Sequence, residues 1–281
     1  VQELPQIVAD IMRRSQVPGM AVAVVIDGKT VLAQGYGTRE AGKQAPVDAQ
    51  TVFQIASISK SLSATVAAIE VSKGRASWDD PVSRYLPDFR LSNAYVSERA
   101  TIGDFFAHRS GLPGTAGDDL EDLGFSRRDV IARLRLLPLD AFRTSYHYAN
   151  FSTTIGAEAV AKAAGRPWEQ LADDQLFKPL GMKSTSYRYG DFEARSNRAV
   201  LHAYQHGRFV PAGQRNADQQ APAGGVSSTV IDLAEWLKLL LADGQYQGKA
   251  LITPGALLPA LSPQAFSARA HDLDSRSGFY G

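Results

Sequence analysis

The spacing of apolar residues changes twice within the first 40 positions of the chain. Over residues 3–14 the apolar positions recur every three or four residues, which predicts an amphipathic helix. Residues 20–26 are then continuously apolar, and a second β-rich run at residues 29–35 follows the dipeptide Asp27-Gly28. Two such runs around Asp-Gly predict a β-hairpin. Because the first run contains no polar position, we expect its strand to be covered on both faces.

Helical spacing dominates the rest of the chain. No Gly or Pro interrupts residues 57–73, so we expect a buried helix that starts at or near Ser57 and ends at Gly74. Residues 75–225 contain prolines at intervals that interrupt the helical pattern, so short helices are predicted there, and strand patterns are scarce. Further predicted helices are residues 151–164, 167–176 and 233–244, and the predicted N-caps are Thr101 and Ser126.

Composition narrows the classes of function. The chain has 281 residues and no cysteine, which excludes disulfide frameworks, Cys-ligated zinc, iron–sulfur clusters and thiol catalysis. Lys plus Arg is 30 and Asp plus Glu is 29, and this balance gives no broad basic field for a nucleic acid. The longest wholly apolar run, residues 20–26, is much shorter than the roughly 20 residues of a membrane-spanning helix. We therefore expect no nucleic-acid partner and no membrane span.

The first candidate for chemistry is Ser57-Ile-Ser-Lys60. Residues three apart share one face of a helix, and a hydroxyl in the first turn lies near the positive helix end. A buried lysine one turn further on has a lowered pKa and can take the hydroxyl proton. Chance alone expects roughly 0.7 Ser-x-x-Lys matches in such a chain. By itself the pattern therefore leaves open a solvent-facing Ser and Lys at a helix start.

The second candidate is Tyr148-Ala-Asn150. We expect a phenol near a lysine ammonium to have a lowered pKa and to shuttle protons. The asparagine can hold either a substrate amide or the lysine head. Chance expects roughly 0.14 such matches, so this pattern is more informative, although a packed loop Tyr and a turn Asn remain the alternative.

Histidines offer weaker alternatives. His108 and His147 are candidates for the base of a Ser–His–Asp triad, but the chain has no Gly-x-Ser-x-Gly elbow. His202 and His206 have the i, i+4 spacing of helical metal ligands, yet the glutamate of a zinc hydrolase is missing and a surface loop is expected there.

Taken together, in this order and about 90 residues apart, the two motifs resemble those of the serine β-lactamase-related superfamily. The resemblance is to class C-like β-lactamases, DD-peptidases and family VIII-type esterases. Further stretches that are similar to this family are residues 17–24, 53–60, 78–87, 101–113, 177–182 and 223–228.

The resemblance implies a fold and a set of roles. The fold class would be α/β (α+β), with an antiparallel sheet flanked by helices and a mostly helical inserted domain. Residues 1–74 and 226–281 would form the discontinuous α/β domain, and residues 75–225 the helical domain. The implied roles are Ser57 as acylated nucleophile and oxyanion N–H donor, Lys60 and Tyr148 as shared general base, Tyr148 as proton donor to the leaving group, and Asn150 as a substrate-orienting residue.

One family feature is missing. The third motif, Lys/His-Ser/Thr/x-Gly on an inner C-terminal strand, has no match except the loose Arg276-Ser-Gly278, which only three residues follow. We do not expect it to serve as the motif, because such a strand must be paired on both edges. We expect that the chain is incomplete, and that its C-terminal strands are disordered, cleaved or supplied by a second polypeptide.

The sequence thus predicts a serine hydrolase that forms a covalent acyl-enzyme with an ester, amide or β-lactam carbonyl. The expected substrate is a small molecule or a peptide, and no metal or organic cofactor is expected. A dedicated DD-peptidase or β-lactamase is one alternative, and a non-catalytic binding or scaffold member of the fold is another. The family's habits, and a chain that starts at Val1 rather than Met, favour a periplasmic or secreted location and leave a cytoplasmic one open.

Overall fold

The computed structural model describes residues 1–268 and 276–281. At the N-terminus, helix α1 (Leu4–Ser15) precedes the antiparallel hairpin of β1 (Gly19–Ile26) and β2 (Lys29–Gly37). The turn places Asp27 and Gly28 at φ 50° and 71°, as a two-residue turn that follows the strand twist requires. The predicted helix and hairpin are both confirmed.

Strand β1 is less covered than its sequence predicts. Its residues from Gly19 to Val25 are only half-buried, and Ile26 is exposed. Within the described residues β1 pairs with β2 alone, so its second edge carries no strand. Helix α12 (Val230–Leu241) packs beside the hairpin. The expectation of cover on both faces is wrong, because an apolar run specifies what a strand can bury and not what lies against it.

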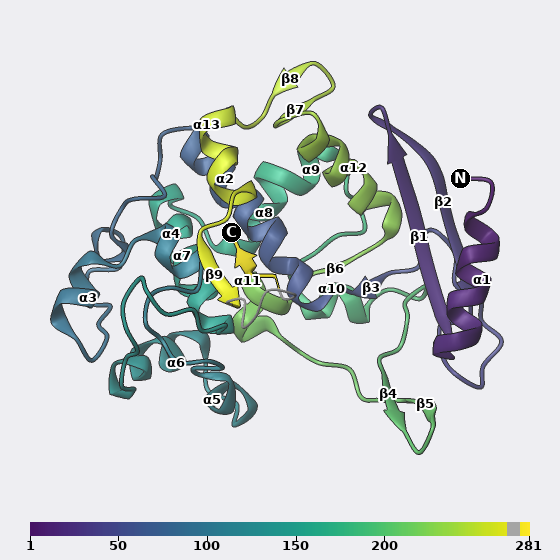
Figure 1. Cartoon of the computed structure of the whole chain (residues 1–281), viewed down its shortest axis with the longest axis horizontal. Coiled ribbons are helices and arrows are strands. Elements are labelled where there is room, and N and C mark those ends of the chain that lie inside the picture. The colour runs from purple at the N-terminus through teal and green to yellow at the C-terminus, as the bar shows by residue number, and fades with distance from the viewer. Residues whose placement is uncertain (269–275) are drawn as a thin grey trace.

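Helix α2 (Ser59–Ser72) runs through the middle of the molecule (Figure 1). A single 3₁₀ turn, η1 (Ala56–Ile58), leads into it, and Gly74 follows its end at φ 70°. Leu62 and Val66 are fully buried on this helix. Short strands β3 (Phe53–Gln54) and β6 (Ser227–Ser228) pair just ahead of η1. The predicted buried helix near Ser57 is confirmed.

The segment between residues 75 and 225 is mostly helical. Its helices are η2 (Val82–Arg84), α3 (Ala94–Arg99), α4 (Ile102–Phe106), α5 (Asp118–Asp122), α6 (Arg127–Arg133), η3 (Leu134–Leu136), α7 (Asn150–Ala164), α8 (Trp168–Ala172), the π-helical η4 (Asp173–Phe177), α9 (Lys178–Leu180), α10 (Tyr189–Glu193), η5 (Asp218–Gln220) and α11 (Ala221–Gly224). One hairpin, β4 (His202–Gln205) with β5 (Arg208–Pro211), interrupts them. The division into two domains remains a prediction.

Both predicted N-caps are present. Thr101 accepts a hydrogen bond from the backbone N–H of Asp104, whose carboxylate accepts one from Thr101 N–H in return. Ser126 accepts from the N–H of Asp129 at the start of α6. These caps fix the starts of helices α4 and α6.

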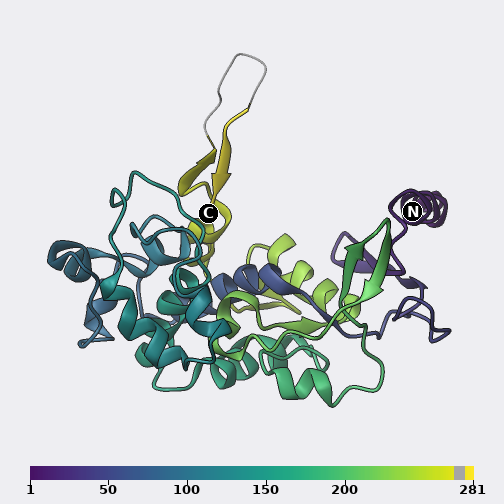
Figure 2. The same cartoon turned by 90° about the horizontal axis from the view of Figure 1, so that it is seen from below.

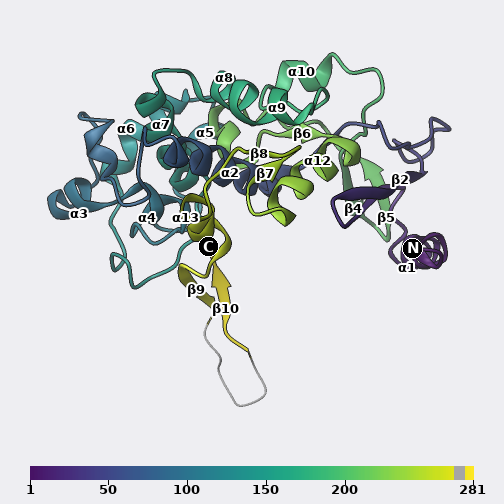
Figure 3. The same ribbon diagram turned by 90° about the horizontal axis from the view of Figure 1, so that it is seen from above.

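Residues 53–261 are called the helical body below, and the main hydrophobic core lies within it. This main cluster combines side chains of α2, α4, α7, α8 and α12, and among the described residues it takes none from α1, β1 or β2, although Val8 of α1 is itself buried. Figures 2 and 3 show the reason: the purple N-terminal segment forms one end of an elongated molecule, and α3 and α6 lie at the other.

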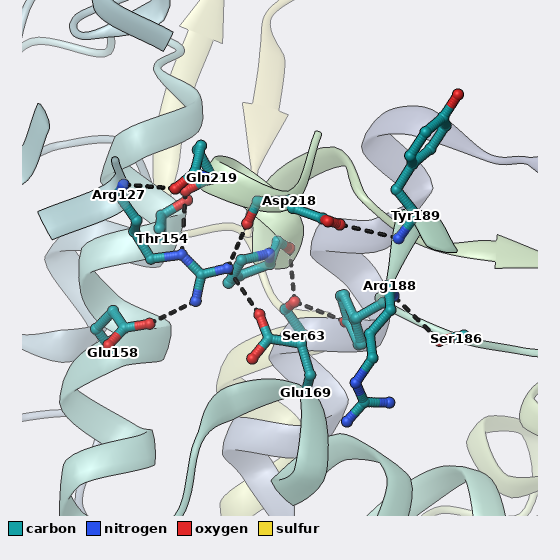
Figure 4. Close-up of polar contacts among 12 residues, drawn as sticks. Ser63, Arg127, Thr154, Glu158, Glu169, Ser186, Arg188, Tyr189, Asp218 and Gln219 are labelled. Carbon is teal, nitrogen blue, oxygen red and sulfur yellow. Dashed lines mark hydrogen bonds and ion pairs between the residues drawn. The ribbon is translucent and has the colours of Figure 1, made fainter. Parts of the chain in front are cut away.

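A half-buried ionic network connects several elements of the body (Figure 4). The Arg127 guanidinium pairs with Glu158 and Glu169, both at 2.7 Å, and donates to the backbone carbonyls of Asp218 and Gln219. Charge-assisted bonds of this kind are stronger than neutral ones. The network therefore fastens the segment just ahead of α11 to helix α7.

The remaining elements follow α12: β7 (Gln245–Tyr246), β8 (Lys249–Ala250), α13 (Pro254–Leu257), η6 (Leu258–Leu261), β9 (Ala265–Ala268) and β10 (Gly278–Tyr280). Strands β9 and β10 pair antiparallel, and so do β7 and β8. In the described part of the chain no helix combines the length and the apolar character needed to cross a bilayer.

Candidate active site

Ser57 and Lys60 lie at the junction of η1 and α2, on one face. Ser57 is exposed, whereas Lys60 is only 5% exposed. The Lys60 Nζ donates to Ser57 Oγ at 3.3 Å. The backbone N–H of Ser57 belongs to the first helical turn, where N–H groups lack intrahelical acceptors.

The backbone before the serine is strained and held from behind. Ala56 has φ 46°, an unusual value for a residue with a side chain. Ser59 Oγ donates to the Ala56 carbonyl at 2.5 Å and accepts from the N–H of Val226 at 3.0 Å. Strained positions of this kind persist only where the surroundings hold them. Ser59 thus connects the Ser57 turn to the chain that follows α11.

The Lys60 amine has three acceptors. Besides Ser57 Oγ, it donates to Asn150 Oδ1 at 2.8 Å and to the Ala223 carbonyl at 2.9 Å. An ammonium has three N–H donors, so the charged form is fully satisfied. A neutral amine has two donors and one lone pair, which match the two shorter contacts and the Ser57 hydroxyl. The site therefore accommodates both protonation states without rearrangement.

Burial lowers the pKa of Lys60 from its usual 10.5 to about 8, and the nearby Asp118 carboxylate opposes this shift. About one tenth of the side chain is therefore neutral at pH 7. The sequence-based expectation of a lowered lysine pKa is confirmed.

Tyr148 reaches Ser57 from the loop ahead of α7. Its Oη donates to Ser57 Oγ at 2.6 Å, and the Lys60 Nζ lies 4.4 Å from its ring centroid. The ammonium thus faces the ring and makes no hydrogen bond to the phenol. Burial raises the Tyr148 pKa, although the bond to Ser57 opposes the shift. The expected lowering is wrong, because desolvation of the phenolate and the negative charge of Asp118 together raise the pKa.

Asn150 is the first residue of α7, and its amide faces two charged groups. Its Oδ1 accepts from Lys60, while its Nδ2 donates to the Asp118 carboxylate at 3.1 and 3.3 Å. Of the two roles open to it from the sequence, the structure shows a contact to the lysine head. The substrate-orienting role stays a prediction.

His108 supports Tyr148 from behind. It is 2% exposed, adopts φ 55°, and its ring centroid lies 4.7 Å from that of Tyr148. Its Nδ1 accepts from the N–H of Ala149, and burial lowers its pKa to about 3. The imidazole is therefore neutral at pH 7. His147, in contrast, is half-exposed and pairs with Asp140 at 3.3 Å.

The C-terminal hairpin closes one side of the site. The Tyr280 ring in β10 lies 4.8 Å from His108 and 6.4 Å from Tyr148, centroid to centroid. Of the loose third-motif match, Gly278 opens this strand and Arg276 is exposed. Within the described residues, Arg276 makes no hydrogen bond or ion pair with Ser57, Lys60 or Tyr148.

A cavity of about 500 Å³ opens beside Lys60 along α2. Its walls carry the apolar side chains of Trp78, Phe106, Trp236, Leu257 and Tyr280. Of the motif residues, Lys60 lines this cavity, whereas Ser57, Tyr148 and Asn150 do not.

These residues come from distant parts of the chain, and comparison with known proteins identifies the family of that chain. The family model described as Beta-lactamase matches residues 4–279. The chain belongs to the beta-lactamase family. Its fold class and its resemblance to β-lactamase-related proteins, both predicted from the motifs, are confirmed.

Three relatives of this beta-lactamase family member illustrate its range. An unguisins hydrolase of Aspergillus campestris is 28% identical over 95% of this chain and 50% of its own length. The D-alanyl-D-alanine-carboxypeptidase/endopeptidase AmpH of Escherichia coli is 28% identical over 86% of this chain and 64% of its own. A β-lactamase of Escherichia coli is 27% identical over 83% and 61%. The chain thus spans between half and two thirds of these relatives.

A solved structure supports the fold. The octameric penicillin-binding protein homologue from Pyrococcus abyssi superposes with a TM-score of 0.79 at 21% identity, and the match covers all of this chain and 63% of that one.

Sequence reasoning missed three participants: Asp118, the Ala223 carbonyl and Tyr280. The glycines after Ala223 were a usable signal, since a Cβ on Gly225 would lie 2.7 Å from the Ala221 backbone. Asp118 gave none, because its contact with Asn150 spans 32 residues and exists only in the folded chain.

Proposed function

We propose that this beta-lactamase family member hydrolyses a carbonyl compound through a covalent acyl-enzyme on Ser57. The observation that carries the proposal is the convergence of the Lys60 amine and the Tyr148 phenol on one exposed hydroxyl. A serine is a weak nucleophile until a neighbouring base takes its proton. Here the base and a second proton carrier both touch Ser57 Oγ.

In the acylation step Ser57 Oγ attacks the substrate carbonyl and its proton passes to neutral Lys60. The amine keeps its two short bonds to Asn150 and Ala223 throughout, so its lone pair stays directed at Ser57. The negative charge on the former carbonyl oxygen is stabilised by the N–H of Ser57. Little reorganisation is needed in this step.

Tyr148 serves as the acid that completes acylation. Its raised pKa keeps the phenol protonated, so it can donate to the leaving group as the carbonyl carbon–heteroatom bond breaks. Lys60 makes no hydrogen bond to the phenol, so the proton it holds returns to the phenolate by exchange with solvent, which reaches the exposed Ser57. Water attacks the acyl-enzyme by the same route in reverse and frees Ser57.

The substrate class is an ester, an amide or a β-lactam. Relatives are named for hydrolysis of unguisins, of D-alanyl-D-alanine ends and of β-lactams, which favours an acyl group attached to nitrogen.

A fluorophosphonate probe tests the proposal directly. We expect one adduct at Ser57, located by mass spectrometry of the peptide, and none in Ser57→Ala. Ser61→Ala is the matched control, because Ser61 is an exposed serine one turn along the same helix. Absence of an adduct in the folded wild-type protein would leave the non-catalytic alternative.

Chromogenic substrates then separate the hydrolase classes. Turnover of an ester but not of a β-lactam indicates an esterase. Turnover of nitrocefin indicates a β-lactamase, and turnover of a D-alanyl-D-alanine peptide indicates a DD-peptidase. Each assay includes Ser57→Ala as the blank.

We further propose that a strand from a second polypeptide pairs with the free edge of β1. Support comes from the half-buried apolar residues of β1 and its single strand partner within the described chain. Two-stranded sheets are marginal in water. The test is the intact mass of the purified protein with hydrogen exchange of the β1 amides. A co-purifying polypeptide that protects these amides supports the proposal, and a lone 30.3 kDa chain contradicts it.

A further inference from the structure

Asp118 contacts the site without touching the nucleophile. It is the first residue of α5 and is half-buried. Its two carboxylate oxygens lie 3.3 and 3.1 Å from Asn150 Nδ2. A carboxylate is an acceptor only, so it can face the NH₂ side of an amide and not the oxygen side. Its presence decides which way the Asn150 amide points.

The orientation of the Asn150 amide determines which of its two groups faces the Lys60 amine. With Nδ2 turned to Asp118, the Asn150 Oδ1 faces the amine at 2.8 Å. A rotated amide would present its NH₂ group to the ammonium, and two donors would then face each other. The third acceptor of the amine, the Ala223 carbonyl, cannot by itself fix the direction of the lone pair toward Ser57.

The backbone is shaped to bring Asp118 here. Gly117 has φ 93°, and a Cβ at this position would lie 2.7 Å from Val130 Cγ1 and 2.8 Å from Phe151 Cδ2. Only glycine therefore lets α5 start against α7, next to Asn150. The N–H of Thr115 donates to the Tyr148 carbonyl at 3.0 Å, which joins the same loop to the other side of the site.

We propose that Asp118 is a positioning residue that holds the Asn150 amide in one orientation and, through it, holds the Lys60 amine against Ser57. The proposal rests on the proposed function for its catalytic meaning. Its structural content, the orientation and charge state of Lys60, can be measured whether or not Ser57 reacts.

The charge of Asp118 has a second effect, which is on the pKa of Lys60. Asp118 raises the pKa of Lys60 against the lowering by burial. Burial raises the pKa of Asp118 itself, while the hydrogen bond from Asn150 and the charges of Arg215 and Lys60 lower it, and Asp122 raises it further. Around the amine, Tyr148 and His108 are neutral at pH 7, since burial raises the pKa of the phenol and lowers that of the imidazole. Asp118 is thus the negative charge that faces Lys60.

The test is a titration of Lys60 by NMR in protein labelled with lysine ¹³Cε, with the resonance assigned through Lys60→Arg. Asp118→Asn keeps the size of the side chain and removes its charge. We expect the Lys60 pKa, about 8 in the wild type, to fall by about one unit. Asp119→Asn, an exposed neighbour on the same helix, is the matched control and leaves it unchanged. An unaltered Lys60 pKa in Asp118→Asn overturns the proposal.

Turnover of the chromogenic ester gives the second readout. Asp118→Asn is expected to lower the plateau value of kcat about tenfold with KM nearly constant, and to move the ascending limb of the pH profile to lower pH with the Lys60 pKa. In an Asn150→Ala background the same change should cost less than about threefold, because the amide it acts through is gone. Equal losses in both backgrounds contradict the proposal.

Two outcomes remain to be distinguished. A Lys60 pKa that falls in Asp118→Asn, in a protein that no probe acylates, keeps the positioning role and removes the proposed function. Should Asp118→Asn fail to fold by its thermal midpoint, Asp118→Glu preserves the charge, and we expect it to restore the Lys60 pKa to within about half a unit. A Lys60 pKa in Asp118→Glu that falls by a full unit would contradict the proposal.

Discussion

The helical body and the N-terminal hairpin both contain strongly apolar segments, but they bury these segments to different extents. In the body, Leu62 and Phe105 are fully buried in one continuous core. In the hairpin, the uninterrupted run Met20–Ile26 leaves every residue partly or fully exposed. The difference lies in what surrounds each element: α2 is enclosed by α7, α11 and α13, whereas β1 has β2 on one edge and α12 beside it.

The candidate active site lies in the better packed of these two regions. Ser57, Lys60, Tyr148 and Asn150 all belong to the body, and their hydrogen bonds do not reach the N-terminal hairpin. A rigid core can hold side chains to the tolerance that catalysis needs. The site is therefore expected to survive changes in the hairpin and to fail with changes in the body.

The largest expected effect is the loss of acylation in Lys60→Ala. Without the amine, Ser57 has no base, and we expect fluorophosphonate labelling and ester turnover to fall by about 10³-fold or more. The thermal midpoint should stay roughly unchanged, since the lysine is partly desolvated at a cost in the native state. Parallel loss of fold and labelling would instead mark Lys60 as structural.

Matched truncations compare the two regions directly. Phe105→Ala in the core should lower the free energy of unfolding by about 3–5 kcal/mol, whereas Val24→Ala in β1 should lower it by about 1 kcal/mol. Urea unfolding followed by tryptophan fluorescence measures both, because Trp78, Trp168 and Trp236 all lie in the body. Similar losses for the two variants would show that the hairpin is as well packed as the core.

Acid should weaken the body through His108. Its pKa is about 3 when folded and about 6.5 when unfolded, so the unfolded chain binds more protons between these values. Stability from this group is present above pH 6.5 and is lost as pH falls toward 3. We expect the thermal midpoint to drop by about 5 °C between pH 7 and pH 5 on this account. His108→Gln should remove that part of the slope, and an unchanged slope would contradict the assignment.

The smallest effect is the pH dependence of turnover. Because Lys60 must be neutral to accept a proton, the rate should rise with pH and level off above its pKa of about 8, a gain of about tenfold from pH 7 to pH 9. Stopped assays with a pH-stable ester measure it. Val24→Ala should share the wild-type profile, and a shifted limb in this variant would link the hairpin to the site.

Much of the local structure was predictable from particular residues. Asp27-Gly28 specified the hairpin turn, Thr101 and Ser126 specified helix starts, and the absence of Gly and Pro after Ser57 specified α2. The Ser-x-x-Lys and Tyr-x-Asn patterns also placed four side chains that the structure brings together. These features depend on neighbours within a few residues, where sequence determines geometry.

The environment of those side chains was decided by tertiary structure. The Tyr148 pKa is raised and not lowered, because desolvation depends on how His108 and Tyr280 cover the ring. Asp118 reaches Asn150, and the Ala223 carbonyl reaches Lys60, only through folding of segments 32 and 163 residues apart. Periodicity and propensity act over a few residues, whereas burial and charge act through space. The sequence by itself therefore determined which groups could react, and the fold alone decided their protonation, their orientation and their partners.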